Sequence, residues 1–156
     1  MRPLLTALVY LSLAVAAFAE SRVAPPLQQA QQLTLYRLDP DSIIRHTRTR
    51  FHGYRIVAGP TMADQQTRDL FARVLVRAYS VKWPSLYCAF KPVFGASFLI
   101  GRRRIDVMMC PHCGEMPYYE GSRLLATADL SAAASKLFPV YRRIYRNDPV
   151  VQSVTQ

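Results

Sequence analysis

The sequence predicts a small single-domain α+β protein, with a mainly antiparallel sheet and two or three helices packed on one face. Two hairpin patterns carry this prediction, one across residues 93–110 and one across residues 116–127. Apolar residues also recur at helical spacing in residues 61–83 and 130–146. Because the predicted strands follow one another through short turns, we expect antiparallel pairing, with the helices covering one face of the sheet.

The first nineteen residues have the pattern of an export signal. Met1 and Arg2 give a short positive end, residues 4–17 are mostly apolar, and Ala17-Phe18-Ala19 supplies a small-x-small cleavage site. An uncleaved membrane anchor is the alternative, but the apolar run is shorter than the roughly 20 residues that span a bilayer. We therefore expect residues 1–19 to be removed, which predicts a periplasmic or extracellular protein with no transmembrane segment.

After the signal, we expect a flexible leader, one folded domain and a loose tail. The leader covers residues 20–35, which are rich in Gln, Ala and Pro and show no clear period. The domain covers residues 36–149 and begins near Asp39-Pro40-Asp41-Ser42, a turn pattern in which proline fixes φ and the aspartates can bond to the backbone. The tail covers residues 150–156. A chain of this length can form one core without disulfides or metals.

In the first half of the domain, residues 43–57 are predicted to form a strand with a bend at Gly53. Such a strand could bind an anionic ligand, but protection of a sheet edge by charge explains the pattern more simply. Gly59-Pro60 should end the strand, and a helix should run from Thr61 to residues 81–83, before Pro84. One face of the strand would carry basic, histidine and tyrosine side chains: His46, Arg48, Arg50, His52 and Tyr54.

In the second half, residues 93–100 and 105–110 are predicted to form two strands, with the turn at Gly101-Arg102-Arg103. A second hairpin pairs residues 116–119 with residues 123–127. Asp129 is a candidate N-cap for a helix over residues 130–138. Pro139 should end that helix or open a turn, although the residues after it again have helical spacing.

The chain is strongly basic, with 20 Lys and Arg, 10 Asp and Glu, and a formal net charge of +10. Such a charge favours solubility and attracts anionic surfaces, so an anionic envelope surface or polymer is a candidate partner. We do not expect nucleic acid as a partner. Arg102, Arg103 and Arg104 form a candidate anion-binding tip, although a solvated turn explains them more simply.

All three cysteines, Cys88, Cys110 and Cys113, flank the first predicted hairpin. Export would place them in an oxidising compartment, where disulfides form and persist. If the hairpin turn lies at Gly101-Arg102, Cys113 faces Phe90, so Cys88 is nearer in register to Cys113 than to Cys110. We therefore predict Cys88 and Cys113 as the candidate disulfide, which would leave one thiol of the Cys-x-x-Cys pair free.

Zinc binding is an alternative role for the same cysteines. The segment Cys110-Pro111-His112-Cys113-Gly114 has the turn pattern of half a zinc-ribbon site, in which both sulfurs point at one ion. Tetrahedral zinc needs four ligands, so Cys110 and Cys113 would be joined by Cys88 and by His112, or by His46 or His52 instead. One such turn with a distant cysteine is weaker evidence than two paired turns.

Cys110-Pro111-His112-Cys113 is also identical to the active-site tetrapeptide of the periplasmic DsbA-type oxidoreductases, whose fold is thioredoxin-like. The resemblance covers four residues and implies thiol–disulfide exchange by Cys110 and Cys113. In that family the motif begins a helix within a βαβ arrangement, whereas here Gly114 and Pro117 follow it and no βαβ pattern surrounds it. Covalent haem attachment is excluded, because Gly114 stands where Cys-x-x-Cys-His requires histidine.

Four short motifs extend over most of the expected domain: Leu38-Asp39-Pro40, Phe51-His52-Gly53-Tyr54, Cys88-x-Phe90-x-Pro92, and Asp106-Val107-x-x-Cys110-x-x-Cys113. In this combination the chain resembles a group of exported bacterial proteins of unknown activity, which share an L-D-P, a C-x-F-x-P and a strand ending in C-x-x-C. The resemblance implies no known activity. It implies that the three cysteines form one spatial cluster.

The sequence shows no paired carboxylates, serine triad or phosphate-binding loop. We therefore predict a non-enzymatic module, associated with the envelope or acting through interactions, with a structural three-cysteine cluster and no cofactor. The alternatives are a zinc-binding domain and a thiol–disulfide oxidoreductase, both built on the same cysteines.

Overall fold

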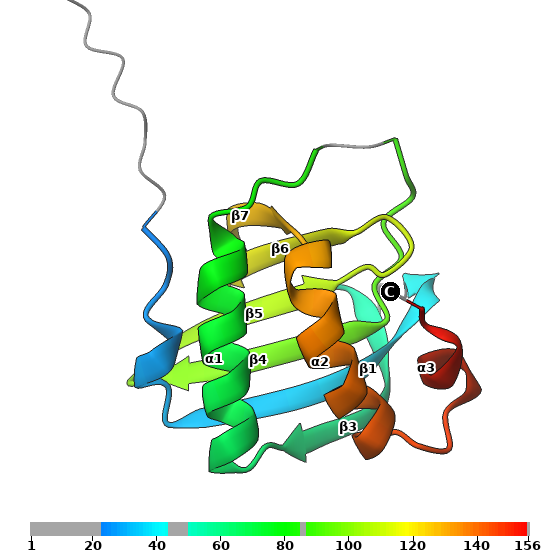
Figure 1. Cartoon of the computed structure of the whole chain (residues 1–156), viewed down its shortest axis with the longest axis horizontal. Coiled ribbons are helices and arrows are strands. Elements are labelled where there is room, and N and C mark those ends of the chain that lie inside the picture. The colour runs from blue at the N-terminus through cyan, green and yellow to red at the C-terminus, as the bar shows by residue number, and fades with distance from the viewer. Residues whose placement is uncertain (1–22, 44–49, 85–86, 156) are drawn as a thin grey trace, which may run out of the picture.

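A computed structural model describes residues 23–43, 50–84 and 87–155 of the 156-residue chain. These residues form a curled, seven-stranded antiparallel sheet, and helices α1 and α2 lie across one of its faces (Figure 1). The predicted α+β class, with a mainly antiparallel sheet and helices on one face, is confirmed. The export signal predicted for residues 1–19 lies outside the described residues.

The strands are arranged in the order β2-β3-β1-β4-β5-β6-β7. Strands β4 to β7 follow one another as a meander, while β1 lies between β3 and β4. Helix α1 therefore connects β3 to β4 over the face of the sheet. In chain order the elements are η1 (Leu27–Gln29), β1 (Gln32–Ile43), β2 (Arg50–Phe51), β3 (Tyr54–Met62), α1 (Gln65–Tyr79), β4 (Phe94–Ile100), β5 (Arg103–Met109), β6 (Glu115–Glu120), β7 (Arg123–Asp129), α2 (Ser131–Ile144) and α3 (Pro149–Ser153).

Both hairpins predicted for the second half of the chain are confirmed. In the β4–β5 hairpin, Phe94 pairs with Met109 and Gly95 pairs with Met108, which is the register expected from a turn at Gly101-Arg102. In the β6–β7 hairpin, Met116 pairs with Ala128. A one-residue slip would turn every core side chain to the opposite face, so the alternating pattern specifies the register strongly.

The main core lies between the sheet and the two long helices. Tyr141 of α2 stacks on Phe94 of β4 with 4.2 Å between ring centroids, and its hydroxyl donates to the carbonyl of Gly95 at 2.8 Å. Each buried Phe or Leu contributes roughly 1.5–3 kcal/mol relative to leaving it exposed. The largest buried side chains of this core are Leu27, Leu33, Leu35, Phe71, Leu75, Phe94, Phe98, Tyr118, Phe138 and Tyr141.

A second, smaller core lies on the face that the helices leave uncovered. It consists of Leu38, Phe51, Tyr54 and Met108. A Cβ atom added to Gly95 would lie 2.9 Å from the ring of Phe51, closer than real Cβ atoms approach other groups. The absence of a side chain at Gly95 therefore allows the β2–β3 hairpin to curl over β4.

The start of the folded region differs from the expected boundary at residue 36. Residues 27–35 contain η1 and the beginning of β1, and Leu27, Leu33 and Leu35 are fully buried. The apolar residues Leu33 and Leu35 alternate as in a half-buried strand, but the neighbouring glutamines resemble a flexible leader in composition. The expectation of a flexible leader is therefore wrong for residues 27–35.

The strand expected over residues 43–57 is a hairpin in the structure. β2 and β3 are joined at His52 and Gly53, which have φ angles of 48° and 91°. β2 lies at the edge of the sheet, in agreement with the charged pattern. His46 and Arg48 lie outside the described residues.

β3 also continues through Gly59-Pro60, where the strand was expected to end. Among the described residues, β2 pairs only with Tyr54 and Arg55, so in this part of the chain the later residues of β3 have a partner strand on one side alone. Proline is tolerated at such an edge because its missing N–H removes no ladder hydrogen bond there. The peptide bond between Gly59 and Pro60 is cis.

Helix α1 begins later than expected. Asp64 is its N-cap, and the Asp64 carboxylate accepts a hydrogen bond from the backbone N–H of Thr67 at 2.7 Å. The helix was expected to begin at Thr61, but Thr61 belongs to β3 and pairs with Leu35. The helix ends at Tyr79, a few residues before the expected limit.

Pro139 does not end α2, contrary to the prediction. Leu137, Phe138, Val140 and Tyr141 are all buried against the core, so packing on both sides of Pro139 holds one continuous helix. Pro139 itself is exposed, and its ring meets solvent rather than the sheet.

The C-terminal residues are also more ordered than the expected loose tail at residues 150–156. They contain α3, which Asp148 caps by accepting hydrogen bonds from the backbone N–H groups of Val150 and Val151. Val151 is fully buried and Val154 is 8% exposed. The expectation of a loose tail is therefore wrong for residues 150–154.

Candidate functional site

A cluster of polar side chains lies on the face of the sheet that the helices leave uncovered. Alternation along β5 turns Ile105 and Val107 toward the helices and turns Arg104 and Asp106 toward this face. Ser97 pairs with Asp106 across the β4–β5 hairpin. His52 reaches the same point from the β2–β3 turn. We call His52, Ser97, Arg104 and Asp106 the polar cluster.

Asp106 is the centre of the polar cluster and is only 6% exposed. Its carboxylate lies 2.9 Å from Nε2 of His52 and accepts a hydrogen bond from the Ser97 hydroxyl at 2.6 Å. Nε of Arg104 donates to the same carboxylate at 3.0 Å and to the Ser97 hydroxyl at 2.8 Å. Three side chains from three separate strands or turns thus converge on one buried carboxylate.

The surroundings of Asp106 keep it ionised. Burial raises the pKa of a carboxyl group, but the hydrogen bonds with His52 and Ser97 and the charge of Arg104 outweigh burial. The pKa of Asp106 therefore lies below its ordinary value. A charge held in this way has a fixed position, and it fixes the groups bonded to it.

His52 is held by aromatic contacts as well as by Asp106. Its ring stacks on Tyr119 with 4.4 Å between centroids and meets the edge of Phe51 at 5.1 Å. Ser97 and His52 both bond to Asp106, whereas a catalytic triad requires the serine to bond to the histidine. The three residue types are therefore together without the geometry of a serine nucleophile.

A hollow of about 200 Å³ lies beside Arg104 on this face. Burial raises the pKa of Tyr36, and the nearby Arg104 charge lowers it to a smaller extent, so the phenol remains protonated at neutral pH. No carboxylate of the described residues lines the hollow. We call it the Arg104 hollow; its lining residues are Gln32, Thr34, Tyr36, Ser97, Leu99 and Arg104.

The three arginines predicted as an anion-binding tip do not act together. Arg102 is exposed at the hairpin turn, and Nε of Arg103 pairs with Glu120 at 2.6 Å. Arg104 points to the opposite face of β5 and joins the polar cluster. Strand alternation separates Arg103 from Arg104, because successive side chains of a strand face opposite sides.

Sequence reasoning did not identify Ser97, Asp106 and His52 as a site. The predicted hairpin register already placed Ser97 opposite Asp106, so a search for facing polar pairs would have found these two. The contribution of His52 depends on the curl of the β2–β3 hairpin over the sheet, which has no local signal in the sequence.

The Cys-x-x-Cys motif forms the turn between β5 and β6. The backbones of Cys110 and Glu115 form an isolated antiparallel β-bridge. The backbone N–H of Gly114 donates to the carbonyl of Cys110 at 2.9 Å. Gly114 has a φ angle of 67°, which glycine adopts without strain. We call residues 110–114 the thiol turn.

Both thiols of the thiol turn are buried and face each other. The sulfurs of Cys110 and Cys113 are 2.7 Å apart, and all three cysteines of the chain are free. The backbone N–H of Lys91 donates to the sulfur of Cys110 at 3.3 Å. The predicted disulfide joined Cys88 to Cys113, but the structure brings Cys110 and Cys113 together.

Cys88 lies beside the thiol turn. The thiols of Cys88 and Cys113 both donate to the carbonyl of Ala89, each at 3.6 Å. Burial raises the pKa of Cys113, and the neighbouring thiols of Cys110 and Cys88 raise it further. Cys113 is therefore a protonated thiol at neutral pH.

The histidine proposed as the fourth zinc ligand lies elsewhere on the thiol turn. His112 is exposed and lines a hollow of about 340 Å³ together with Pro111 and Lys91. Within residues 23–43, 50–84 and 87–155, no group of three or more His, Cys, Asp or Glu side chains is arranged to hold a metal ion.

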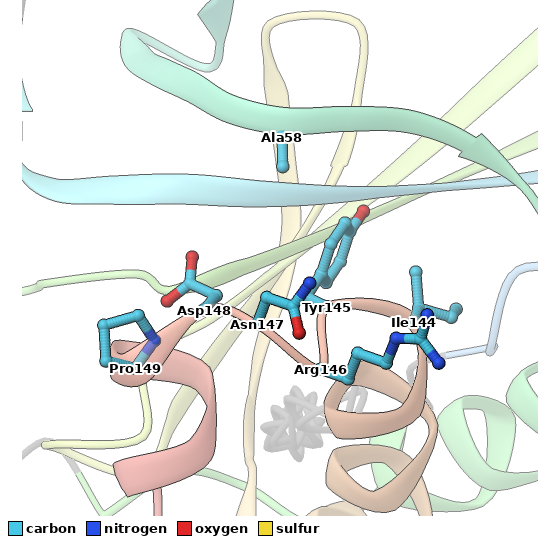
Figure 2. A pocket seen from close by; sticks show the side chains of 7 residues that line it. All are labelled: Ala58, Ile144, Tyr145, Arg146, Asn147, Asp148 and Pro149. Carbon is cyan, nitrogen blue, oxygen red and sulfur yellow. The ribbon is translucent and has the colours of Figure 1, made fainter.

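The largest of these hollows, about 410 Å³, lies between β3 and the connection from α2 to α3 (Figure 2). Figure 2 shows the side chains of Tyr145 and Asp148 directed toward the strands. The Tyr145 hydroxyl donates to the carbonyl of Leu35 at 3.0 Å, and Asp148 accepts from Nε of Arg37 at 2.9 Å. These groups are therefore already engaged in holding the helices to the sheet.

Comparisons of the chain with models of protein families, with curated proteins and with solved structures found no match. None of the helices in the described part of the chain is long and apolar enough to cross a membrane.

Proposed function

We propose that this chain is an exported, non-enzymatic binding module of the cell envelope, and that the thiol turn is a structural element of it. The observation that carries the proposal is the pair of buried sulfurs, Cys110 and Cys113, 2.7 Å apart between two paired strands. A disulfide here would hold the end of β5 to the start of β6 in an oxidising compartment.

Oxidation would join the two sulfurs directly. Each thiol loses one proton and one electron, and the two electrons reduce the disulfide of an exported oxidant protein to two thiols. The contact favours Cys110 and Cys113 as the pair, in place of the pair of Cys88 and Cys113 predicted from the hairpin register. Cys88 would remain a thiol beside the bond.

A catalytic role for the thiol turn is less well supported. Thiol–disulfide exchange requires a thiolate, and reactive thiolates lie at helix N-termini or beside cationic groups that lower their pKa. The pKa of Cys113 is raised, and the thiol turn lies between two strands. Both features favour a structural bond over an exchange enzyme.

The ligand of the module is proposed to be anionic. The formal net charge of the full chain is +10, and loss of Arg2 with the export signal would leave +9 (10 − 1). Such a charge attracts anions from solution and from surfaces such as phospholipid headgroups or acidic polysaccharides. We call the face of the sheet that the helices leave uncovered the helix-free face. On this face, Arg104 is held in a fixed position beside the Arg104 hollow.

Peptide mapping of exported protein, alkylated without reduction, tests the structural role of the thiol turn. We expect a cross-linked peptide with Cys110 bonded to Cys113, and Cys88 alkylated on every chain. A Cys88–Cys113 link would keep the structural role but reject the proposed pairing. Three alkylated thiols would reject the proposal, and one zinc per chain that is lost in Cys110→Ser would support the zinc-binding alternative instead.

A turnover assay tests the enzyme alternative separately. The exported protein should reduce insulin no faster than its Cys113→Ser variant. Faster reduction by the unsubstituted protein would reject the non-enzymatic part of the proposal and support the oxidoreductase.

A further inference from the structure

We propose that the Arg104 hollow binds a phosphate group, either free phosphate or the phosphate of a lipid headgroup. The inference rests on the proposed binding function and assigns it a site. It is carried by four features of the helix-free face: the way Arg104 is held, the donors that surround the hollow, the charge around it, and its size.

Arg104 is held in place by hydrogen bonds that its Nε atom donates. Both of its hydrogen bonds to described residues use Nε, which donates to Ser97 and to Asp106. The side chain is 54% exposed, although Asp106 beneath it is buried. Among the described residues, the terminal guanidinium nitrogens meet no carboxylate, and Tyr36 is close enough to interact with the guanidinium. These nitrogens can therefore donate two parallel hydrogen bonds to an oxyanion, the arrangement in which arginine binds phosphate.

The other side of the hollow supplies a neutral donor, the Tyr36 hydroxyl of β1. The Thr34 hydroxyl and the Gln32 amide also line the hollow, but both donate to Met62, and the Gln32 amide donates to Thr34 as well. The Tyr36 hydroxyl can donate, because its raised pKa keeps it protonated at neutral pH. Tyr36 of β1 and Arg104 of β5 thus present donors from two strands, which suits an oxyanion with several acceptor oxygens.

The charge balance in the hollow also favours an anion. Among the described residues, the carboxylate in contact with Arg104 is that of Asp106, which bonds to the Nε side of the guanidinium and whose oxygens are occupied by His52 and Ser97. An anion on the opposite side of the guanidinium would lie closer to the positive charge than to that carboxylate, although the Asp106 charge still acts on Tyr36. A volume of about 200 Å³ is suited to a phosphate group rather than to a large ligand.

Titration of the exported protein with inorganic phosphate at constant ionic strength tests the site, with Arg104→Gln and Arg103→Gln as matched variants. Arg103 lies on the same strand, but it faces the other side and pairs with Glu120. We expect Arg104→Gln to raise the phosphate Kd at least about tenfold, because bidentate charge-assisted hydrogen bonds are lost. Arg103→Gln should change the Kd less than about twofold. Tyr36→Phe should weaken binding while retaining the ring.

Two further arms identify the source of the phosphate. Vesicles of phosphatidate in phosphatidylcholine, compared with phosphatidylcholine alone, report binding to a lipid headgroup. Binding that depends on Arg104 in either the vesicle or the inorganic phosphate arm supports the site and names its source. Equal affinity for acetate and phosphate would overturn the proposed ligand class.

The site is overturned if phosphate and phosphatidate bind Arg104→Gln as tightly as the unsubstituted protein, or if neither binds the unsubstituted protein. The thermal unfolding midpoint of each variant shows whether the fold is retained. If Arg104→Gln does not fold, Tyr36→Phe decides the question in its place. A fixed Cys110–Cys113 disulfide with no phosphate binding would reject this site while leaving the structural role of the thiol turn intact.

Discussion

Asp106 joins the strands and the turn of the helix-free face through its hydrogen bonds. It is a buried carboxylate with hydrogen bonds to His52, Ser97 and Arg104. Removal of one partner from a buried, bonded charge leaves the other groups without compensation, and this costs more than the loss of an exposed ion pair. The fold therefore depends on Asp106 more than on the surface carboxylates.

Substitution of Asp106 by Asn should lower the free energy of unfolding by roughly 2–4 kcal/mol in urea denaturation at neutral pH. Asp41→Asn is the matched control, because Asp41 is exposed and pairs only with Lys91 among the described residues. The control should change stability by less than about 0.5 kcal/mol. Equal effects of the two substitutions would contradict this account of the polar cluster.

The same carboxylate gives a pH dependence with a defined sign. The folded-state pKa of Asp106 is lowered, so its contribution is present above the unfolded pKa and is lost as the pH falls through the folded pKa. Stability of the unsubstituted protein should therefore decline below about pH 4. The difference in free energy of unfolding between the unsubstituted protein and Asp106→Asn should narrow in that range. A difference that widens on acidification would contradict the lowered pKa of Asp106.

The close packing of Phe51 on Gly95, which the curl of the sheet requires, can be tested by adding one methyl group. Gly95→Ala places a Cβ against the ring of Phe51, and we expect a loss of about 1–3 kcal/mol from overpacking. In the double variant Gly95→Ala with Phe51→Leu, the smaller side chain should recover part of that loss. Losses that simply add in chemical denaturation would show that the two residues do not touch.

At the scale of elements, α2 contains a proline, Pro139, whose exposed ring adds no packing against the core. Pro139→Ala restores an N–H donor to the middle of the helix without removing buried surface. We expect the free energy of unfolding to rise by about 1–3 kcal/mol. Lys136→Ala, also exposed on α2, should stay within about 0.5 kcal/mol. A loss of stability in Pro139→Ala would mean that the proline ring packs in the native fold.

The thiol turn is the element whose stability should depend on redox state. Closing a loop of about four residues by a disulfide is worth roughly 2 kcal/mol in the chain-entropy model. Addition of a reductant should therefore lower the free energy of unfolding by about this amount. Cys88→Ser should respond in the same way, and the double variant Cys110→Ala with Cys113→Ala should not respond at all. A response that is lost in Cys88→Ser would indicate the other pairing.

At the scale of the molecule, local patterns predicted the second half of the fold and missed much of the first. The hairpins β4–β5 and β6–β7 join strands that are adjacent in sequence, and their turns and alternation are visible directly. By contrast, β1 pairs with β3 and with β4, which is distant along the chain. Such pairing is determined by tertiary packing, which overrides a glutamine-rich composition and an internal Gly-Pro.

The candidate sites divide in the same way. The cysteines were identified from motif and register, and the structure places Cys88 beside the thiol turn. Only part of the polar cluster could be predicted from the sequence. Ser97 and Asp106 face each other in a local hairpin, whereas His52 comes from a turn that is distant along the chain. Sequence alternation could have separated Arg104 from Arg103, since it decides which arginine reaches the helix-free face.

The central claim is that this chain is exported and that its thiol turn closes as a disulfide. Intact-mass measurement of the protein from the exported fraction, without reduction, tests both parts at once. We expect a chain that begins at Glu20 and is lighter than its all-thiol form by two hydrogen atoms, with that difference absent in Cys110→Ser. A chain that retains residues 1–19, or one with the full all-thiol mass, would contradict the account.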